Sequence, residues 1–153
     1  MKSLEVKVPP PVVAAVIAVA MWGTSRFAPL LHLSSTLRFT ATAGMALIGI
    51  GFSMAGVMAF RRARTTVNPT TPERASSLVS SGVFRITRNP MYVGLAWILG
   101  AWAVFLSSAW ALLGLVAFVF YMDRFQIAPE ERALAKLLGD EYTSYQARVR
   151  RWL

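Results

Sequence analysis

Long stretches of apolar residues alternate with short polar and charged segments along the chain, and this pattern predicts helices that cross a membrane. A transmembrane helix needs roughly 20 apolar residues. Residues 39–60 contain no charged side chain and meet this length. Residues 11–33 are similarly apolar, with Arg26 and His32 near the far end, where both side chains can snorkel to the interface. These stretches predict spans at about 11–33 and 38–60.

The next apolar stretch, residues 91–122, contains no charged side chain at all. As one straight helix it would be about 48 Å long, which exceeds one crossing, whereas two full crossings need about 40 residues. We therefore expect a tight hairpin of two short helices that breaks at Ser107-Ser108, with spans at about 91–106 and 109–125. The predicted fold class is all-α, a polytopic membrane protein with about four transmembrane helices.

The C-terminal tail after these spans has the signals of two further short helices. Pro129 suits a helix start and Gly139 a helix end, so a separate capped helix is expected between them. A second helix is expected at about 141–148, where Tyr142 and Tyr145 share a stripe that favours packing over catalysis. Both helices form the predicted cytoplasmic helical tail.

The composition agrees with one small membrane domain over residues 1–153. The chain is 56% hydrophobic with a mean hydropathy of +0.51, which is too apolar for a typical soluble domain. It contains no cysteine, which excludes disulfides, thiolate metal sites and a cysteine nucleophile. Its single histidine disfavours a zinc site, so no metal is predicted.

The net charge of +9 is unevenly distributed, and its distribution predicts the orientation. Arginines gather in residues 61–90 and in the tail after residue 123, while the predicted hairpin tip has none. Positive residues favour the cytoplasmic side of a membrane and anionic lipid headgroups. We expect membrane lipids rather than nucleic acid as partners. Both termini and the 61–90 loop are expected in the cytoplasm, at a prokaryotic inner or plasma membrane.

Two polar stretches at this cytoplasmic boundary are candidate site segments, because ionisable groups there are costly to desolvate. The first runs from Gly82 to Tyr92 and the second from Pro129 to Tyr145. Simpler interpretations exist for both. Arg88-Asn89-Pro90 can be a helix start with Asn89 as N-cap, and the glutamates of the tail can complement a helix dipole, worth about 0.3–1 kcal/mol.

Taken together, these segments resemble the isoprenylcysteine carboxyl methyltransferase family and its relatives, which include phospholipid N-methyltransferases. The resemblance covers the run from Arg64 to the C-terminus. It implies an integral membrane enzyme that uses S-adenosylmethionine to methylate a lipophilic small molecule. The matching motifs are Thr65-Thr66-Val67-Asn68-Pro69, Leu78-Val79-x-x-Gly82-Val83-Phe84, Arg88-Asn89-Pro90-Met91-Tyr92, Glu130-Glu131 and Gly139-x-x-Tyr142-x-x-Tyr145.

The resemblance also implies a cofactor site built from residues 64–92 and 126–153. Asn89 stands where the family has histidine, so it can form hydrogen bonds but cannot act as a titrating base. Gly49-Ile50-Gly51 resembles a cofactor-contacting Gly-x-Gly, although small residues for close helix packing are the stronger interpretation. The implied catalytic residues are Arg88, Tyr92 and Glu131, and the implied cofactor-binding residues are Leu78, Val79, Phe84, Asn89, Pro90, Met91, Tyr92 and Glu130.

The resemblance defines the methyl acceptor less clearly than it defines the cofactor site. Gln126 stands where the prenylcysteine branch has an arginine that faces the substrate carboxylate, and an amide cannot replace a bidentate arginine. Arg124 is a substitute on a different helix face, so both residues are candidate substrate contacts. We expect the apolar tail of the acceptor to enter sideways between helices, while the cofactor arrives from the cytoplasm. The alternatives are an NADPH-dependent sterol-type reductase and a non-catalytic membrane scaffold.

Overall fold

The computed structural model describes residues 8–27, 31–63 and 78–153. Within these ranges every regular element is helical, and Thr87 and Arg150 form one isolated bridge pairing. The predicted all-α class is thus confirmed. The elements are α1 (Pro10–Ser25), α2 (Ser35–Arg62), the single turn η3 (Gly82–Arg85), α3 (Pro90–Leu106), η4 (Ala109–Ala111), α4 (Leu112–Tyr121), the π-helical segment η5 (Met122–Ile127), α5 (Ala128–Leu138) and α6 (Asp140–Arg148).

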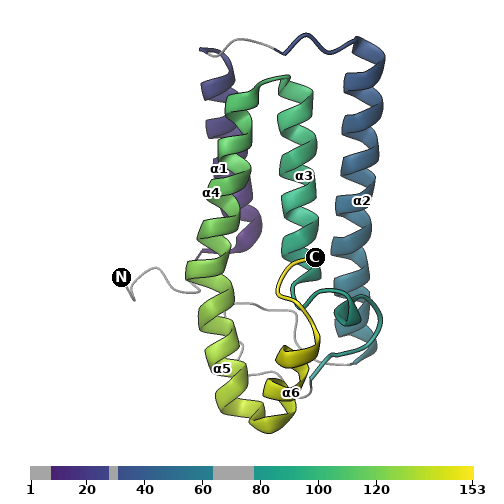
Figure 1. Cartoon of the computed structure of the whole chain (residues 1–153), viewed down its shortest axis with the longest axis vertical. Coiled ribbons are helices and arrows are strands. Elements are labelled where there is room, and N and C mark those ends of the chain that lie inside the picture. Colours follow the sequence, from purple (N-terminus) through teal and green to yellow (C-terminus); the bar gives the residue numbers. More distant parts are fainter. Residues whose placement is uncertain (1–7, 28–30, 64–77) are drawn as a thin grey trace.

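Helix α3 lies at the centre of the molecule, with α2 on one side and α1 and α4 on the other (Figure 1). Its contact with α2 is very close, because a Cβ atom on Gly49 would lie 2.6 Å from the carbonyl oxygen of Gly94. A Cβ atom on Gly51 would meet nothing within 4 Å. Gly49 therefore serves close helix packing, which is the stronger of the two interpretations of Gly49-Ile50-Gly51.

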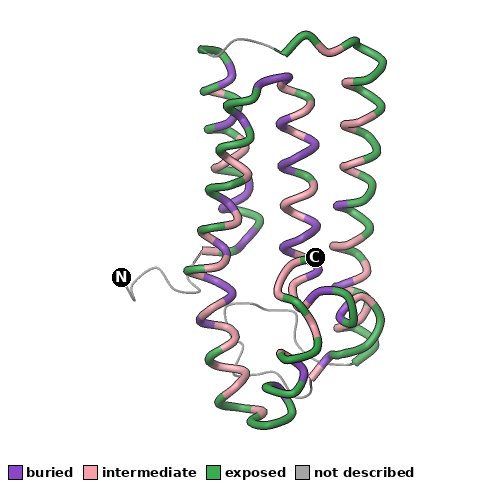
Figure 2. The backbone as a smooth tube through the Cα atoms, viewed as in Figure 1, coloured by how far each residue is buried: buried purple, intermediate pink, exposed green. Residues whose placement is uncertain are grey.

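In the described ranges, two helical stretches are long and apolar enough to cross a membrane. They are α2, with 28 residues, and the continuous run Ala109–Leu138, with 30 residues. In their most apolar windows only 11% and 28% of the residues are buried, so most residues there keep some exposed surface. Figure 2 shows the exposed residues along α2. The apolar helices α1 and α3 have 16 and 17 residues, and the four-span arrangement stays a prediction.

Helix α1 ends at Ser25, short of residue 33, where the first span is predicted to end. Two polar side chains near its end turn back onto the helix: Thr24 Oγ1 donates to the Met21 carbonyl at 3.0 Å and Ser25 Oγ to the Trp22 carbonyl at 2.7 Å. Such bonds satisfy terminal carbonyls and allow the helix to stop. Counting apolar residues along the sequence cannot detect where this helix ends.

The predicted break between the third and fourth helices is confirmed at Ser107-Ser108. Ser107 caps α3 in the left-handed conformation, with φ of 50°, and η4 begins directly after Ser108. The two helices consequently form the expected hairpin, visible at the upper end of α3 and α4 in Figure 1.

The helix predicted between Pro129 and Gly139 is present as α5, but the prediction that it is a separate helix was wrong. The helix of α4 continues through η5 into α5 without interruption, and Pro129 lies at the start of α5. In a π-helical segment each N–H bonds to the carbonyl five residues earlier instead of four. Pro129, which has no N–H, lies where this hydrogen-bond pattern returns to the α-helical one. Gly139, with φ of 55°, ends α5 as expected, and α6 follows.

Candidate functional site

The two polar stretches meet at a hydrogen bond between α3 and α5. Tyr92, in the first turn of α3, donates its hydroxyl to Glu130 Oε1 at 2.6 Å. The Tyr92 side chain is buried, with 4% of its surface exposed. Glu130 follows Asp123 and Arg124, which end the apolar part of its helix. This bond joins residues 38 positions apart in the sequence and brings together two of the predicted site residues.

Burial raises the pKa of Glu130 to about 7, from the ordinary value of a glutamate. The hydrogen bond from Tyr92 acts in the opposite direction and lowers this pKa, while the negative charge of Glu131 raises it. Desolvation disfavours the charged form of a carboxylic acid, which explains the direction of the largest effect. Glu130 consequently changes its charge near neutral pH.

The neighbouring carboxylate, Glu131, is held by two arginines. Arg88 Nη2 lies 3.0 Å from Glu131 Oε1, and Arg151 Nη2 lies 2.5 Å from Oε2. The side chains of Arg88 and Glu131 are only 12% and 13% exposed, so water screens this pair weakly. Arg88 Nε is buried without a hydrogen-bond partner among the described residues. The cluster thus retains a buried donor that the described residues leave unsatisfied.

The last residues of the chain form hydrogen bonds with the residues at the start of α3. The Arg151 carbonyl accepts hydrogen bonds from Thr87 Oγ1 at 3.1 Å and from Asn89 Nδ2 at 2.9 Å. Asn89 is the N-cap residue of α3, as predicted, but its side chain forms no capping bond. The C-terminal segment lies beside the lower end of α3 in Figure 1. Asn89 and Arg151 thereby couple the first site segment to the C-terminus.

Arg151 and Asp123 were not among the predicted site residues. Arg151 Nη1 lies 3.4 Å from Asp123 Oδ1, and the Trp152 indole N–H donates to the same oxygen at 3.1 Å. Asp123 is the first charged residue after the long apolar stretch. A carboxylate at that boundary needs a cation, and this signal points to the arginines near the C-terminus.

Three of the predicted cofactor-binding residues, Phe84, Val79 and Leu78, lie in and just before the single turn η3. Phe84 and Val79 are buried and Leu78 is half-buried. The Phe84 carbonyl accepts a hydrogen bond from Tyr145 Oη at 2.6 Å, and its ring packs edge-on against Phe60. Burial raises the pKa of Tyr145 to about 12, so its hydroxyl stays protonated and donates at neutral pH. This contact supports the packing interpretation of the tail tyrosine.

The remaining predicted residues have contacts of other kinds. Pro90 is buried, and Met91 lies against Gly56 of α2, where a Cβ atom would come within 2.9 Å of Met91 Cγ. Gln126 is fully buried and donates from Nε2 to the Val8 carbonyl at 2.6 Å, whereas Arg124 is exposed. The roles of Gln126 and Arg124 in substrate binding stay predictions. In the described part of the chain, no three His, Asp or Glu side chains are grouped as metal ligands would be.

These features define a class: a small helical protein with outward-facing apolar helices and a shielded cluster of ionisable side chains where those helices meet the tail. Residues 37–141 match the family described as "Phospholipid methyltransferase", and the chain belongs to this family. The family resemblance is thus confirmed, and the protein is a membrane methyltransferase of the kind that acts on lipid-like substrates.

One curated relative is similar to part of the chain. It is an "Uncharacterized protein" from Haemophilus influenzae (strain ATCC 51907 / DSM 11121 / KW20 / Rd), 46% identical over 63 residues. The match covers 41% of this chain and the whole of that protein. No solved structure matches the chain.

Proposed function

We propose that the chain transfers the methyl group of S-adenosylmethionine to a nucleophile on a lipophilic acceptor, at the cluster formed by Tyr92, Glu130 and Arg88. The observation that carries the proposal is the Tyr92–Glu130 hydrogen bond of 2.6 Å. It joins the two segments that the family resemblance assigns to the cofactor, in a chain that belongs to a methyltransferase family. We further propose four membrane crossings, with both termini and this cluster on the cytoplasmic side.

The residues present fit the polar part of S-adenosylmethionine, which has an α-amino group and an α-carboxylate. Glu130 is the partner for the amino group, because among the described residues its carboxylate accepts the Tyr92 hydroxyl at one oxygen, and the other oxygen suits a cation. Arg88 is the partner for the carboxylate, because its buried Nε has no acceptor among the described residues. A charged donor left unsatisfied in this way is costly, and an anionic ligand removes the cost.

S-adenosylmethionine supplies an activated methyl group on a sulfonium, so the protein needs neither a metal nor a covalent nucleophile. The side chains of this site serve to bind, orient and exclude water. Tyr92 fixes the carboxylate of Glu130. Glu131 is bonded by both Arg88 and Arg151, which suits a positioning residue better than a proton acceptor. An acceptor that arrives deprotonated requires no base from the protein.

The direct test is transfer of a labelled methyl group to lipid. Purified protein in detergent is incubated with methyl-labelled S-adenosylmethionine and a bacterial lipid extract, and label in the organic phase is measured. We expect transfer by the wild type and a loss of at least tenfold in Glu130→Gln. Glu141→Gln is the matched control, because Glu141 is an exposed glutamate in the first turn of α6. Equal losses of transfer in both variants, or unchanged transfer in both, would contradict the proposed site.

Two other functions give different results in a binding assay. If the protein is a sterol-type reductase, NADPH should stabilise it against heat and S-adenosylmethionine should not. If it is a scaffold, neither ligand should bind. Membership of a methyltransferase family favours the first proposal over both.

A further inference from the structure

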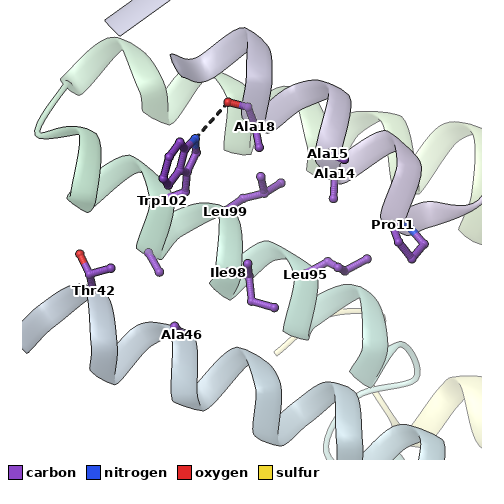
Figure 3. Close-up of a pocket in the computed structure, with 11 residues that line it drawn as sticks. Pro11, Ala14, Ala15, Ala18, Thr42, Ala46, Leu95, Ile98, Leu99 and Trp102 are labelled. Atoms are coloured by element: carbon purple, nitrogen blue, oxygen red, sulfur yellow. Dashed lines mark hydrogen bonds between the residues drawn. The ribbon is translucent and has the colours of Figure 1, made fainter. Parts of the chain in front are cut away.

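An apolar groove lies between α1, α2 and α3, separate from the ionisable cluster (Figure 3). Its volume of about 540 Å³ is in the range of small-molecule sites. Its walls offer two polar side-chain atoms, Thr42 Oγ1 and Trp102 Nε1, and the second already donates to the Ala18 carbonyl at 3.0 Å. The lining residues are Pro11, Ala14, Ala15, Ala18, Thr42, Ala46, Leu95, Ile98, Leu99, Ala101 and Trp102.

The groove has a polar end, and this end lies toward the start of α2. Thr42 Oγ1 is buried without a hydrogen-bond partner among the described residues, and so is Arg38 Nε. Residues four positions apart lie one above the other on a helix, so Arg38 extends the Thr42 side of the groove by one turn. At the other end Pro11 and Leu95 are apolar. An amphiphile in the groove would therefore place its polar head at Arg38.

Aromatic rings hold the Arg38 guanidinium at this end of the groove. It lies 5.0 Å from the centre of the Phe39 ring and 5.8 Å from that of Phe105. Phe105 in turn stacks on Trp102, a lining residue, with ring centres 5.3 Å apart. These contacts give the cation a fixed place, but none of them neutralises its charge.

The charge of Arg38 has no carboxylate to balance it in the described part of the chain. The acidic residues there all belong to η5, α5 and α6, at the opposite end of the bundle from the start of α2. Arg38 also lies in the first turn of α2, where the helix dipole disfavours a cation and favours an anion. An anion from outside the protein would satisfy both Arg38 and the helix terminus.

We propose that this groove binds an anionic phospholipid, with its phosphate on Arg38 and Thr42 and one acyl chain along Ala46, Ile98 and Leu99. The start of α2 lies away from the Tyr92–Glu130 cluster (Figure 1). With the four crossings proposed above, the bound lipid belongs to the opposite leaflet from this cluster and is distinct from the methyl acceptor. This proposal does not depend on the proposed catalytic activity.

The test compares phosphatidylglycerol with phosphatidylcholine of the same chain length, by native mass spectrometry of the full chain in detergent. We expect the wild type to retain phosphatidylglycerol about tenfold better, and Arg38→Gln to lose this preference. Arg26→Gln is the matched control, because Arg26 also lies over a ring, that of Trp22 at 5.4 Å, but Trp22 is not among the residues that line this groove. If both variants lose the preference equally, general surface charge explains it and the proposal fails.

A second variant tests whether the groove itself holds the chain. Ala46→Phe fills the groove and leaves Arg38 in place, so phosphatidylglycerol retention should fall about tenfold. Phosphatidylglycerol with brominated acyl chains should quench the fluorescence of the wild type more than that of Trp102→Phe. Full retention by Ala46→Phe, or quenching independent of Trp102, would show that only the headgroup binds and would overturn the proposal. An unchanged midpoint of thermal unfolding confirms that each variant is folded.

Discussion

Removing the Tyr92 hydroxyl is expected to change the pH at which the cofactor binds. In Tyr92→Phe, Glu130 loses a hydrogen bond to a charged group, which is worth about 1.5–3 kcal/mol. That bond lowers the pKa of Glu130, so its loss should raise the pKa above about 7. Each unit of increase corresponds to about 1.4 kcal/mol. At neutral pH the variant should therefore carry a largely protonated Glu130, which cannot pair with the amino group of the ligand.

The assay is calorimetric titration with S-adenosylhomocysteine at several pH values between about 6 and 9. Wild-type affinity should rise with pH as Glu130 loses its proton, and the midpoint of this rise should shift upward in Tyr92→Phe. Tyr145→Phe is the matched control, because it also removes a buried hydroxyl, one that donates to the Phe84 carbonyl rather than to Glu130. Coincident pH profiles for the wild type and Tyr92→Phe would refute the reasoning.

Three further changes have expected outcomes in thermal unfolding experiments. Arg151→Gln breaks bonds to Glu131 and Asp123 and should cost about 1–3 kcal/mol, whereas the exposed Arg150→Gln should cost little. Gly49→Ala forces a methyl group against the Gly94 carbonyl and should destabilise by about 1–3 kcal/mol, whereas Gly51→Ala meets open space and should not. Because the pKa of folded Glu130 is raised from 4.5 to about 7, its contribution to stability should be complete below pH 4.5. It should disappear as the pH rises through 7, and Glu130→Gln should abolish this dependence.

Helix α2 was predictable because its apolar length, as in residues 39–60, far exceeds that of a typical soluble helix. The hairpin was predictable from one pair of serines in an otherwise apolar run. The end of α1 was not, because it depends on the rotamers of Thr24 and Ser25, which bond to carbonyls three residues earlier. The continuity at Pro129 was missed for a related reason, since a π-helical turn has no signature in the apolar pattern.

The site was predictable in its acidic and aromatic residues and in Arg88, but not in Arg151. Resemblance to a family selected Tyr92, Glu130 and Glu131, and the fold joins them through contacts between α3, α5 and the tail. Arg151 was missed because its place depends on how the C-terminal segment returns to the start of α3. That return uses backbone bonds such as Arg88 N–H to the Arg150 carbonyl at 2.9 Å, and any residue can form such bonds.

The measurement that tests the central claim most directly is titration of the purified, monodisperse protein with S-adenosylhomocysteine, for the wild type, Glu130→Gln and Glu141→Gln. The account predicts binding by the wild type and by Glu141→Gln, and at least tenfold weaker binding by Glu130→Gln, which corresponds to about 1.4 kcal/mol. Absence of binding to the folded wild type, or equal affinity in all three proteins, would contradict a cofactor site at Tyr92 and Glu130.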